Sequence, residues 1–174
     1  LAAQELVDSY TNLYDLNIVS LLPGTLFGPH DYLIGNGMYL IQLYRNNMPG
    51  VLPGGLPCTH VMDEARGHYL AMCNGEKGSH YIISGKKEDN RTLKDMMGII
   101  VDVLREEEPR KEFRKPKIVF HPTMANIAAF FVEIYSKIFN KSCLLSRDSV
   151  RAGSVKNWYY STRAEKDIGY RPKY

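Results

Sequence analysis

The stretch Ile18-Val19-Ser20-Leu21-Leu22-Pro23-Gly24 decides the fold class of this chain. It is a short apolar run that a Pro-Gly pair brings to an end. A continuous apolar run that follows a helix is typical of a buried parallel strand, the returning leg of an α/β unit. We therefore expect an α/β protein in which Pro23 and Gly24 lie at the carboxyl end of a parallel strand.

Helices and extended segments alternate along the rest of the chain. The spacing of apolar residues predicts helices over residues 2–14, 36–46, 63–74, 92–104 and 123–139, and a last short helix that ends at Gly169. Extended segments are expected within residues 49–57, 80–85, 117–120 and 157–160. This order predicts α/β architecture that gives way to a small α+β lobe.

Two of these helices have a predicted start. Thr92 and Asp95 have the spacing of a capping box, in which each residue accepts a backbone N–H of the other. Asp63 is predicted to cap the helix over residues 63–74, with Ala65, Tyr69 and Met72 on its inward side. Gly75 is predicted to stop that helix.

The composition narrows the class of protein. The chain has 174 residues, 44% hydrophobic and 24% charged, with a net charge of +3, which is ordinary for a soluble globular protein. The basic residues form no dense patch, so we expect no nucleic-acid partner. Three cysteines without close spacing argue against a disulfide framework or a zinc site and favour a reducing, cytoplasmic location.

Motifs that would carry a reaction by themselves are missing from the sequence. It contains no G-x-G-x-x-G, P-loop, H-E-x-x-H or G-x-S-x-G pattern. The five histidines have no metal-ligand spacing, so no metal site is expected. The residues alone therefore do not identify a reaction.

Three segments in the same order and separation resemble a known family. They are Leu21-Leu22-Pro23-Gly24-Thr25-Leu26-Phe27-Gly28-Pro29-His30-Asp31, then Thr59-His60-Val61-Met62-Asp63-Glu64-Ala65-Arg66-Gly67-His68, then Tyr160-Ser161-Thr162-Arg163-Ala164-Glu165-Lys166-Asp167-Ile168-Gly169-Tyr170-Arg171-Pro172. The family is the extended short-chain dehydrogenase/reductases, in the branch of dihydroflavonol-4-reductase-like and 3β-hydroxysteroid dehydrogenase-like enzymes and sugar-nucleotide epimerases. The resemblance covers nearly the whole chain.

This resemblance implies the C-terminal part of a Rossmann-type NAD(P)-binding fold with a small α+β substrate-binding lobe. Residues 1–34 would be the last portion of the Rossmann-type core, and residues 35–174 mainly the substrate-binding lobe. The implied function is that of an NAD(P)-dependent oxidoreductase or epimerase. Its substrate would be a hydroxyl or ketone of a medium-sized organic molecule of the dihydroflavonol, steroid or sugar-nucleotide type.

The resemblance also implies a site. The backbone of Pro23, Gly24 and Thr25 would face the nicotinamide of NAD or NADP, and Phe27, His30 and Tyr32 would contact the small-molecule substrate. Glycine lacks a Cβ and proline holds the chain rigid, so such a pair lets a flat ring approach the backbone closely. From the residues alone, a plain strand-ending turn is the other interpretation.

Catalytic residues are not expected in this chain. In the family, a Tyr-x-x-x-Lys pair performs the proton transfer, and the resemblance places it just upstream of Leu1. Neither Tyr10 nor Tyr14 is followed by lysine four residues later. We therefore expect the N-terminal half of the same protein as a partner, and this chain alone to be inactive and poorly stable. The helix over residues 2–14 would belong to a homodimer interface.

Two alternatives stay open. Glu64 stands where the family pattern has valine, which suits a non-catalytic nucleotide-binding or scaffold subunit that keeps the fold. The apolar helix over residues 123–139 is expected to be buried or partly buried, and no membrane partner is expected. An interfacial helix of a lipid-related enzyme is the other interpretation of that segment.

Overall fold

The computed structural model describes residues 2–139 and 146–174, so Leu1 and Cys143 lie outside the described residues. The chain divides into two units. The first comprises Leu1–His30, Pro57–Asn90 and Tyr159–Tyr174, and the second comprises Asp31–Leu56 and Arg91–Trp158. Both units are built from segments that are far apart in the sequence.

Parallel strands form the centre of the first unit. Strand β1 (Ser20–Pro23) pairs with β5 (His80–Ile83), and β2 (Thr25–Phe27) pairs with β4 (Gly55–His60). Strand β6 (Asn90–Thr92), of which Arg91 and Thr92 belong to the second unit, follows β4 in the strand order. The prediction of a parallel strand that ends at Pro23 is confirmed, and with it the α/β class. Strand β2 was not predicted.

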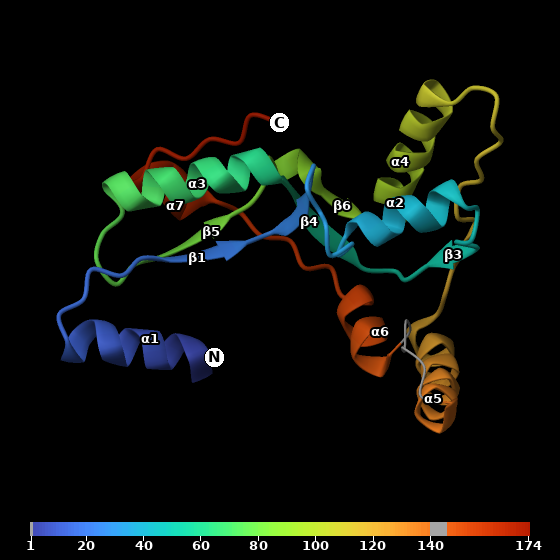
Figure 1. Ribbon diagram of the computed structural model, residues 1–174, viewed down its shortest axis with the longest axis horizontal. Helices are drawn as coiled ribbons and strands as arrows, with labels where there is room; N and C mark the ends of the chain where they lie inside the picture. Colours follow the sequence, from blue (N-terminus) through green and yellow to red (C-terminus); the bar gives the residue numbers. More distant parts are fainter. Residues whose placement is uncertain (1, 140–145) are drawn as a thin grey trace. The chain divides into compact units, whose positions relative to one another are not determined.

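Helices cover both sides of the β1–β5 pair. Helices α3 (Val61–Asn74) and α7 (Thr162–Asp167) lie on one side, and α1 (Ala2–Leu13) lies on the other (Figure 1). Helix α1 is tied to β5 by His80, whose ring nitrogens lie 2.9 Å from Gln4 Nε2 and 3.1 Å from Asp8 Oδ1. Helices on both faces of a parallel sheet give the layering of a doubly wound fold.

The core of the first unit lies between the β1–β5 pair and helices α3 and α7. Its buried members are Ala71, Tyr81, Ile83, Ala164, Ile168 and Tyr170. A Cβ on Gly67 would lie 3.0–3.2 Å from the side chain of Ile83, so the glycine brings α3 close to the sheet. Gly169, at φ +70°, ends the last short helix as predicted.

The predicted roles of residues in α3 need correction. The N-cap is His60, whose Nδ1 accepts the N–H of Met62 at 3.2 Å. Asp63 is instead buried, and its carboxylate accepts the backbone N–H groups of Lys173 and Tyr174 at 3.0–3.1 Å. An acid in the first turn of a helix can cap that helix, or it can bind a distant segment as Asp63 does. The sequence looks the same in both cases, so it could not distinguish them.

The predicted inward face of α3 is also wrong. Ala65, Tyr69 and Met72 are exposed, and the buried residues are Asp63, Glu64, Gly67 and Ala71. The buried side of α3 therefore contains two acids and a glycine. Because these residues are not apolar, the spacing of apolar residues predicted the wrong side of the helix.

The second unit contains helices α2 (Gly37–Tyr44), α4 (Leu93–Glu107), α5 (Pro122–Phe139) and α6 (Arg147–Gly153). Strands β3 (Gly50–Val51) and β7 (Ile118–Val119) form a short parallel pair. Thr92 caps α4 by accepting the N–H of Asp95 at 3.2 Å, as predicted. The buried core of this unit includes Leu43, Leu93, Met96, Met97, Val101 and Phe113.

The surroundings of α5 differ from the prediction. Only Ala129 and Ser136 of this helix are buried, whereas its large apolar side chains are exposed. Helix α6, which was not predicted, packs against α5, and Arg147 at its start pairs with Glu133. Within the described residues, no helix is long and apolar enough to span a membrane.

Candidate functional site

Gly24 joins two strands at a point where only glycine fits. It is the single residue between β1 and β2, and its N–H donates to the carbonyl oxygen of Ile83 at 2.8 Å. A Cβ at this position would lie 2.5 Å from Thr59 Oγ1 and 2.8 Å from the carbonyl oxygen of Pro57. Because one of these atoms belongs to the backbone, a larger residue would push β1 away from β4.

A second glycine stands at the end of the neighbouring strand. Gly85 follows β5, and its N–H donates to Thr59 Oγ1 at 3.1 Å. A Cβ on Gly85 would lie 2.2 Å from the carbonyl oxygen of Cys58. The carboxyl ends of β1 and β5 thus form one edge with two glycines, which we call the glycine edge (Pro23–Thr25 and Ser84–Gly85).

The sequence held a signal for the second half of this edge that the prediction did not use. Ser84-Gly85 follows a predicted strand in the same way as Pro23-Gly24. Strands that run parallel in one sheet bring their carboxyl ends together, and ligands of α/β folds bind at such ends. Thr59 could not be found in this way, because its place depends on the register between β2 and β4.

Buried hydrogen bonds hold the Ser84 end of the glycine edge. The N–H of Ser84 donates to Ser161 Oγ at 2.8 Å, and its carbonyl oxygen accepts from Ser161 Oγ at 3.1 Å and Tyr170 Oη at 3.0 Å. Burial, and then the nearby charges of Asp63 and Glu64, raise the pKa of Tyr170. The phenol therefore stays protonated and serves as a structural donor.

Glu64 is a buried acid without a hydrogen-bond partner. Its side chain lies in the first turn of α3, the residue is 5% exposed, and neither carboxylate oxygen has a partner among the described residues. His68 Nδ1 lies 3.5 Å from Oε1 and 3.0 Å from the Glu64 carbonyl oxygen, with a largely exposed ring. Burial raises the pKa of Glu64, and the charge of His68 opposes the shift.

The residues predicted to contact nicotinamide and substrate differ in how exposed they are to solvent. Pro23 is exposed, and Thr25 is half-buried in β2 opposite Cys58. Phe27 is half-buried at the end of β2, where it pairs with His60. Pro23, Thr25 and Phe27 therefore lie along one segment of the chain, which runs from the end of β1 through β2.

The loop that follows β2 is held in an unusual backbone conformation. His30 is exposed at φ +70°, and Ile34 has φ +52°, which is rare for a β-branched residue. Asp31 accepts the N–H groups of Gly35 and Gly37, both at 2.9 Å, and these bonds lower the pKa of Asp31. Tyr32, in the second unit, is 82% exposed. Strained backbone of this kind is concentrated at ligand-binding loops.

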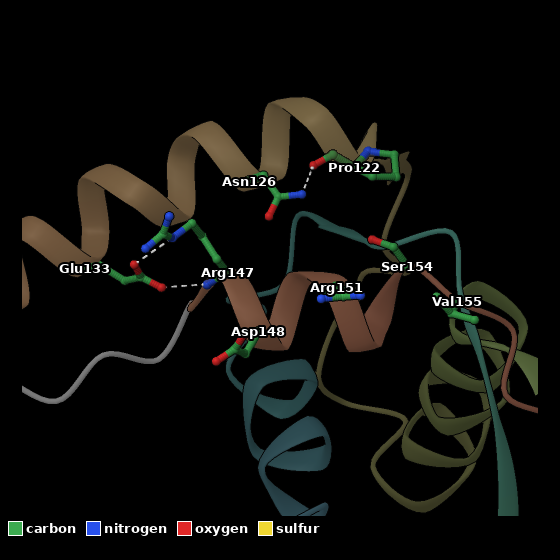
Figure 2. Close-up of a pocket in the computed structure, with 8 residues that line it drawn as sticks. All are labelled: Pro122, Asn126, Glu133, Arg147, Asp148, Arg151, Ser154 and Val155. Carbon is green, nitrogen blue, oxygen red and sulfur yellow. Dashed lines mark hydrogen bonds and ion pairs between the residues drawn. The ribbon is translucent and has the colours of Figure 1, made fainter.

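The second unit has a cavity of about 450 Å³ between α5 and α6 (Figure 2). It is lined by Pro122, Asn126, Glu133, Arg147, Asp148, Arg151, Ser154 and Val155. Glu133 accepts the backbone N–H of Arg147 at 2.7 Å and its Nε at 2.9 Å, and chiefly the backbone bond lowers the pKa of Glu133. Arg151 has no ion pair within the described part of the chain, so its guanidinium is available to an anionic group.

The glycine edge contributes backbone groups and the cavity contributes the guanidinium of Arg151. Within residues 2–139 and 146–174, no three His, Cys, Asp or Glu side chains are placed to hold a metal ion. Neither Tyr10 nor Tyr14 has a lysine four residues later, so α1 carries no Tyr-x-x-x-Lys pair.

Solved structures show which fold this arrangement represents. The chain is similar to PA4631, a nucleoside-diphosphate-sugar epimerase from Pseudomonas aeruginosa, with 17% identity over 99% of this chain and 48% of that chain, at a TM-score of 0.75. It is similar to DesIV, a dTDP-glucose 4,6-dehydratase from Streptomyces venezuelae, with 17% identity over 98% of this chain and 44% of that chain, at a TM-score of 0.61.

A third similar structure is the UDP-glucuronic acid 4-epimerase from Bacillus cereus, with 16% identity over 98% of this chain and 45% of that chain, at a TM-score of 0.62. The chain has the fold of the C-terminal part of Rossmann-type epimerases and dehydratases. It spans less than half of the length of these three proteins. No protein-family model and no curated protein matches the chain.

Proposed function

We propose that this chain is the C-terminal part of an NAD(P)-dependent oxidoreductase or epimerase that acts on a hydroxyl or ketone of a medium-sized organic substrate. The single observation that carries the proposal is the position of the glycine edge, because Pro23–Thr25 and Ser84–Gly85 lie at the paired ends of the parallel strands β1 and β5. The edge stands at the carboxyl ends of parallel strands, where α/β folds bind their ligands.

In this proposal the glycine edge holds a flat nicotinamide ring. Pro23, Gly24 and Thr25 would lie against one face of the ring, and the buried bonds of Ser84 would keep the edge rigid. When bound, the cofactor supplies or accepts the hydride. The structures of DesIV and of the Bacillus cereus epimerase contain NAD, which supports this assignment.

The proton-transfer residues would come from an N-terminal half of the same protein, through a Tyr-x-x-x-Lys pair. The role of this chain is then to bind and orient the substrate. Phe27, His30 and Tyr32 would contact it, and Asp31 would hold their loop through the N–H groups of Gly35 and Gly37. By itself the chain would be inactive, and the protein would act as a homodimer in the cytoplasm.

Among the substrate classes, a sugar nucleotide has most support. Separately from the glycine edge, the cavity in the second unit holds Arg151 beside the carboxylates of Glu133 and Asp148, and a guanidinium can donate two parallel hydrogen bonds to phosphate oxygens. The Bacillus cereus enzyme was solved with UDP-glucuronic acid. A dihydroflavonol or a steroid has no phosphate, so a variant Arg151→Gln should weaken binding of UDP about tenfold or more and leave uncharged ketones unaffected.

The test of cofactor binding is a calorimetric titration of the full-length protein with NAD and NADP. One of them should bind, and Pro23→Trp, which adds bulk at an exposed position, should weaken binding about tenfold with an unchanged melting temperature. The matched control is Gly98→Ala on α4, where a Cβ meets nothing within 4 Å. Equal binding by the Pro23 variant and the wild type would reject the assignment.

A non-catalytic nucleotide-binding or scaffold subunit is the second candidate function, and buried Glu64 favours it. Burial of a carboxylate that accepts no hydrogen bond among the described residues brings no evident advantage to an active enzyme. A full-length protein that binds NAD but oxidises no alcohol and reduces no ketone would support this alternative, and measurable turnover would eliminate it.

A further inference from the structure

Residues 170–174 run beside the glycine edge, and we call them the brace segment. Tyr170 Oη donates to the carbonyl oxygen of Ser84 at 3.0 Å, at the residue that follows β5. Further along the segment, the carbonyl oxygen of Lys173 accepts Lys86 Nζ at 3.1 Å. The brace segment is therefore bonded to both neighbours of the second glycine in that edge.

The brace segment also contacts the end of β4. The ring of Tyr174 stacks on the ring of His60, with the ring centres 4.5 Å apart and the planes at 28°. His60 is the last residue of β4, and the preceding Thr59 accepts the N–H of Gly85 on its Oγ1 at 3.1 Å. The brace segment thus joins the end of β4 to the end of β5, at the point where these two strands hold Gly85 between them.

Asp63 fixes the brace segment to helix α3. The residue is 1% exposed, and its carboxylate accepts the N–H of Lys173 at 3.0 Å and the N–H of Tyr174 at 3.1 Å. Hydrogen bonds from backbone N–H groups to a charged acceptor are among the stronger ones in proteins. Because Asp63 is buried, it can influence a ligand at the glycine edge only through the residues that it holds.

The glycine edge needs such support because it is made of backbone groups. The N–H of Gly24 donates to the carbonyl oxygen of Ile83 at 2.8 Å, and that of Gly85 donates to Thr59 Oγ1. A site built on backbone stays in its binding geometry only if the surrounding residues hold that backbone in place. Tyr170, Lys173 and Tyr174 contact the residues on either side of Gly85 and the end of β4, which are the places where the edge could move.

We propose that the brace segment keeps the glycine edge in its cofactor-binding shape and that Asp63 is the positioning residue that fixes the brace segment. This inference rests on the proposed cofactor site at the glycine edge. Asp63 acts through the backbone of Lys173 and Tyr174, and these two residues act on Lys86 and His60.

The experiment measures amide hydrogen exchange and cofactor binding in the full-length protein. Asp63→Asn and Tyr174→Ala should quicken exchange of the Gly85 N–H, and both should weaken binding of NAD or NADP about three- to tenfold. Lys86→Met, which removes the bond to Lys173, should change both quantities in the same direction.

Two controls separate positioning from lost stability and from lost charge. Thr92→Ala removes the cap of α4 in the second unit and also destabilises the protein, but it should leave cofactor affinity unchanged and quicken Gly85 exchange less than Asp63→Asn does. Lys87→Met removes the neighbouring exposed lysine, whose Nζ lies 6.0 Å from the ring centre of Tyr160, and should bind the cofactor as the wild type does.

The outcomes distinguish this inference from the proposed function. Cofactor binding by the wild type together with unchanged affinity in Asp63→Asn overturns the inference alone. Equal changes in Asp63→Asn and Thr92→Ala also overturn it, because the loss would then follow stability. If the wild type binds neither NAD nor NADP, the cofactor site itself is refuted, and the inference fails with it.

Discussion

Replacing Glu64 with leucine should stabilise the protein. The carboxyl group lies in the buried first turn of α3, and neither of its oxygens has a hydrogen-bond partner among the described residues. Leucine has a similar volume and no polar atoms, so it can occupy the same space without the cost of removing a carboxylate from water.

The magnitude follows from that cost. A buried polar group without a partner destabilises a protein by about 1–3 kcal/mol, and a charged one by more. We therefore expect Glu64→Leu to raise the free energy of unfolding at pH 7 by about 1–3 kcal/mol. In a domain of this size, each kcal/mol shifts the melting temperature by about 2–4 °C.

The pH dependence identifies the cause. Burial raises the pKa of Glu64 in the folded state, so the folded protein binds its proton more tightly than the unfolded chain does. Below the ordinary glutamate pKa of about 4.3 the group is protonated in both states. As the pH rises from there through the raised pKa, the wild type loses stability relative to Glu64→Leu. The advantage of the variant should therefore be smallest at acidic pH.

Urea unfolding of both proteins at several pH values measures this difference. Glu64→Gln is the control, because it removes the charge and keeps an unpaired polar group, so its gain at pH 7 should be smaller. A loss of stability in Glu64→Leu would refute the reasoning. It would show that the charge of His68, whose Nδ1 lies 3.5 Å from Oε1, compensates the carboxylate.

Three further substitutions test other contacts of the fold. Asp63→Asn should cost about 1.5–3 kcal/mol, because it removes a charged acceptor of backbone N–H groups, and amide exchange at Lys173 should quicken. Tyr170→Phe should cost about 1 kcal/mol in urea unfolding, since Ser84 keeps its other donor. Thr92→Ala should cost about 1 kcal/mol through loss of the cap of α4, and the corresponding serine variant should restore most of it.

Local patterns were sufficient to predict much of the fold. The apolar run that ends at Pro23-Gly24 predicted a parallel strand, and the structure pairs it with β5. Thr92 and Asp95 predicted the start of α4, because the capping bond spans three residues. Such features depend on neighbours in the sequence, which a single chain displays directly.

Other features depend on contacts that the sequence does not display. Asp63 was predicted to cap α3, but its partners lie 110 and 111 residues away, at Lys173 and Tyr174. The apolar composition of α5 predicted burial, although composition does not say whether a partner covers a helix. At the glycine edge, Gly24 was predicted, whereas Thr59 needs the register between β2 and β4.

The most direct test of the central claim is a titration of the isotope-labelled full-length protein with NAD or NADP, followed through the backbone amide resonances. The account predicts that the cofactor shifts the resonances of Gly24 and Thr25 and leaves that of Gly98 in place. If the cofactor binds and the resonances of Gly24 and Thr25 do not move, or if neither cofactor binds, the glycine edge is not the nicotinamide site.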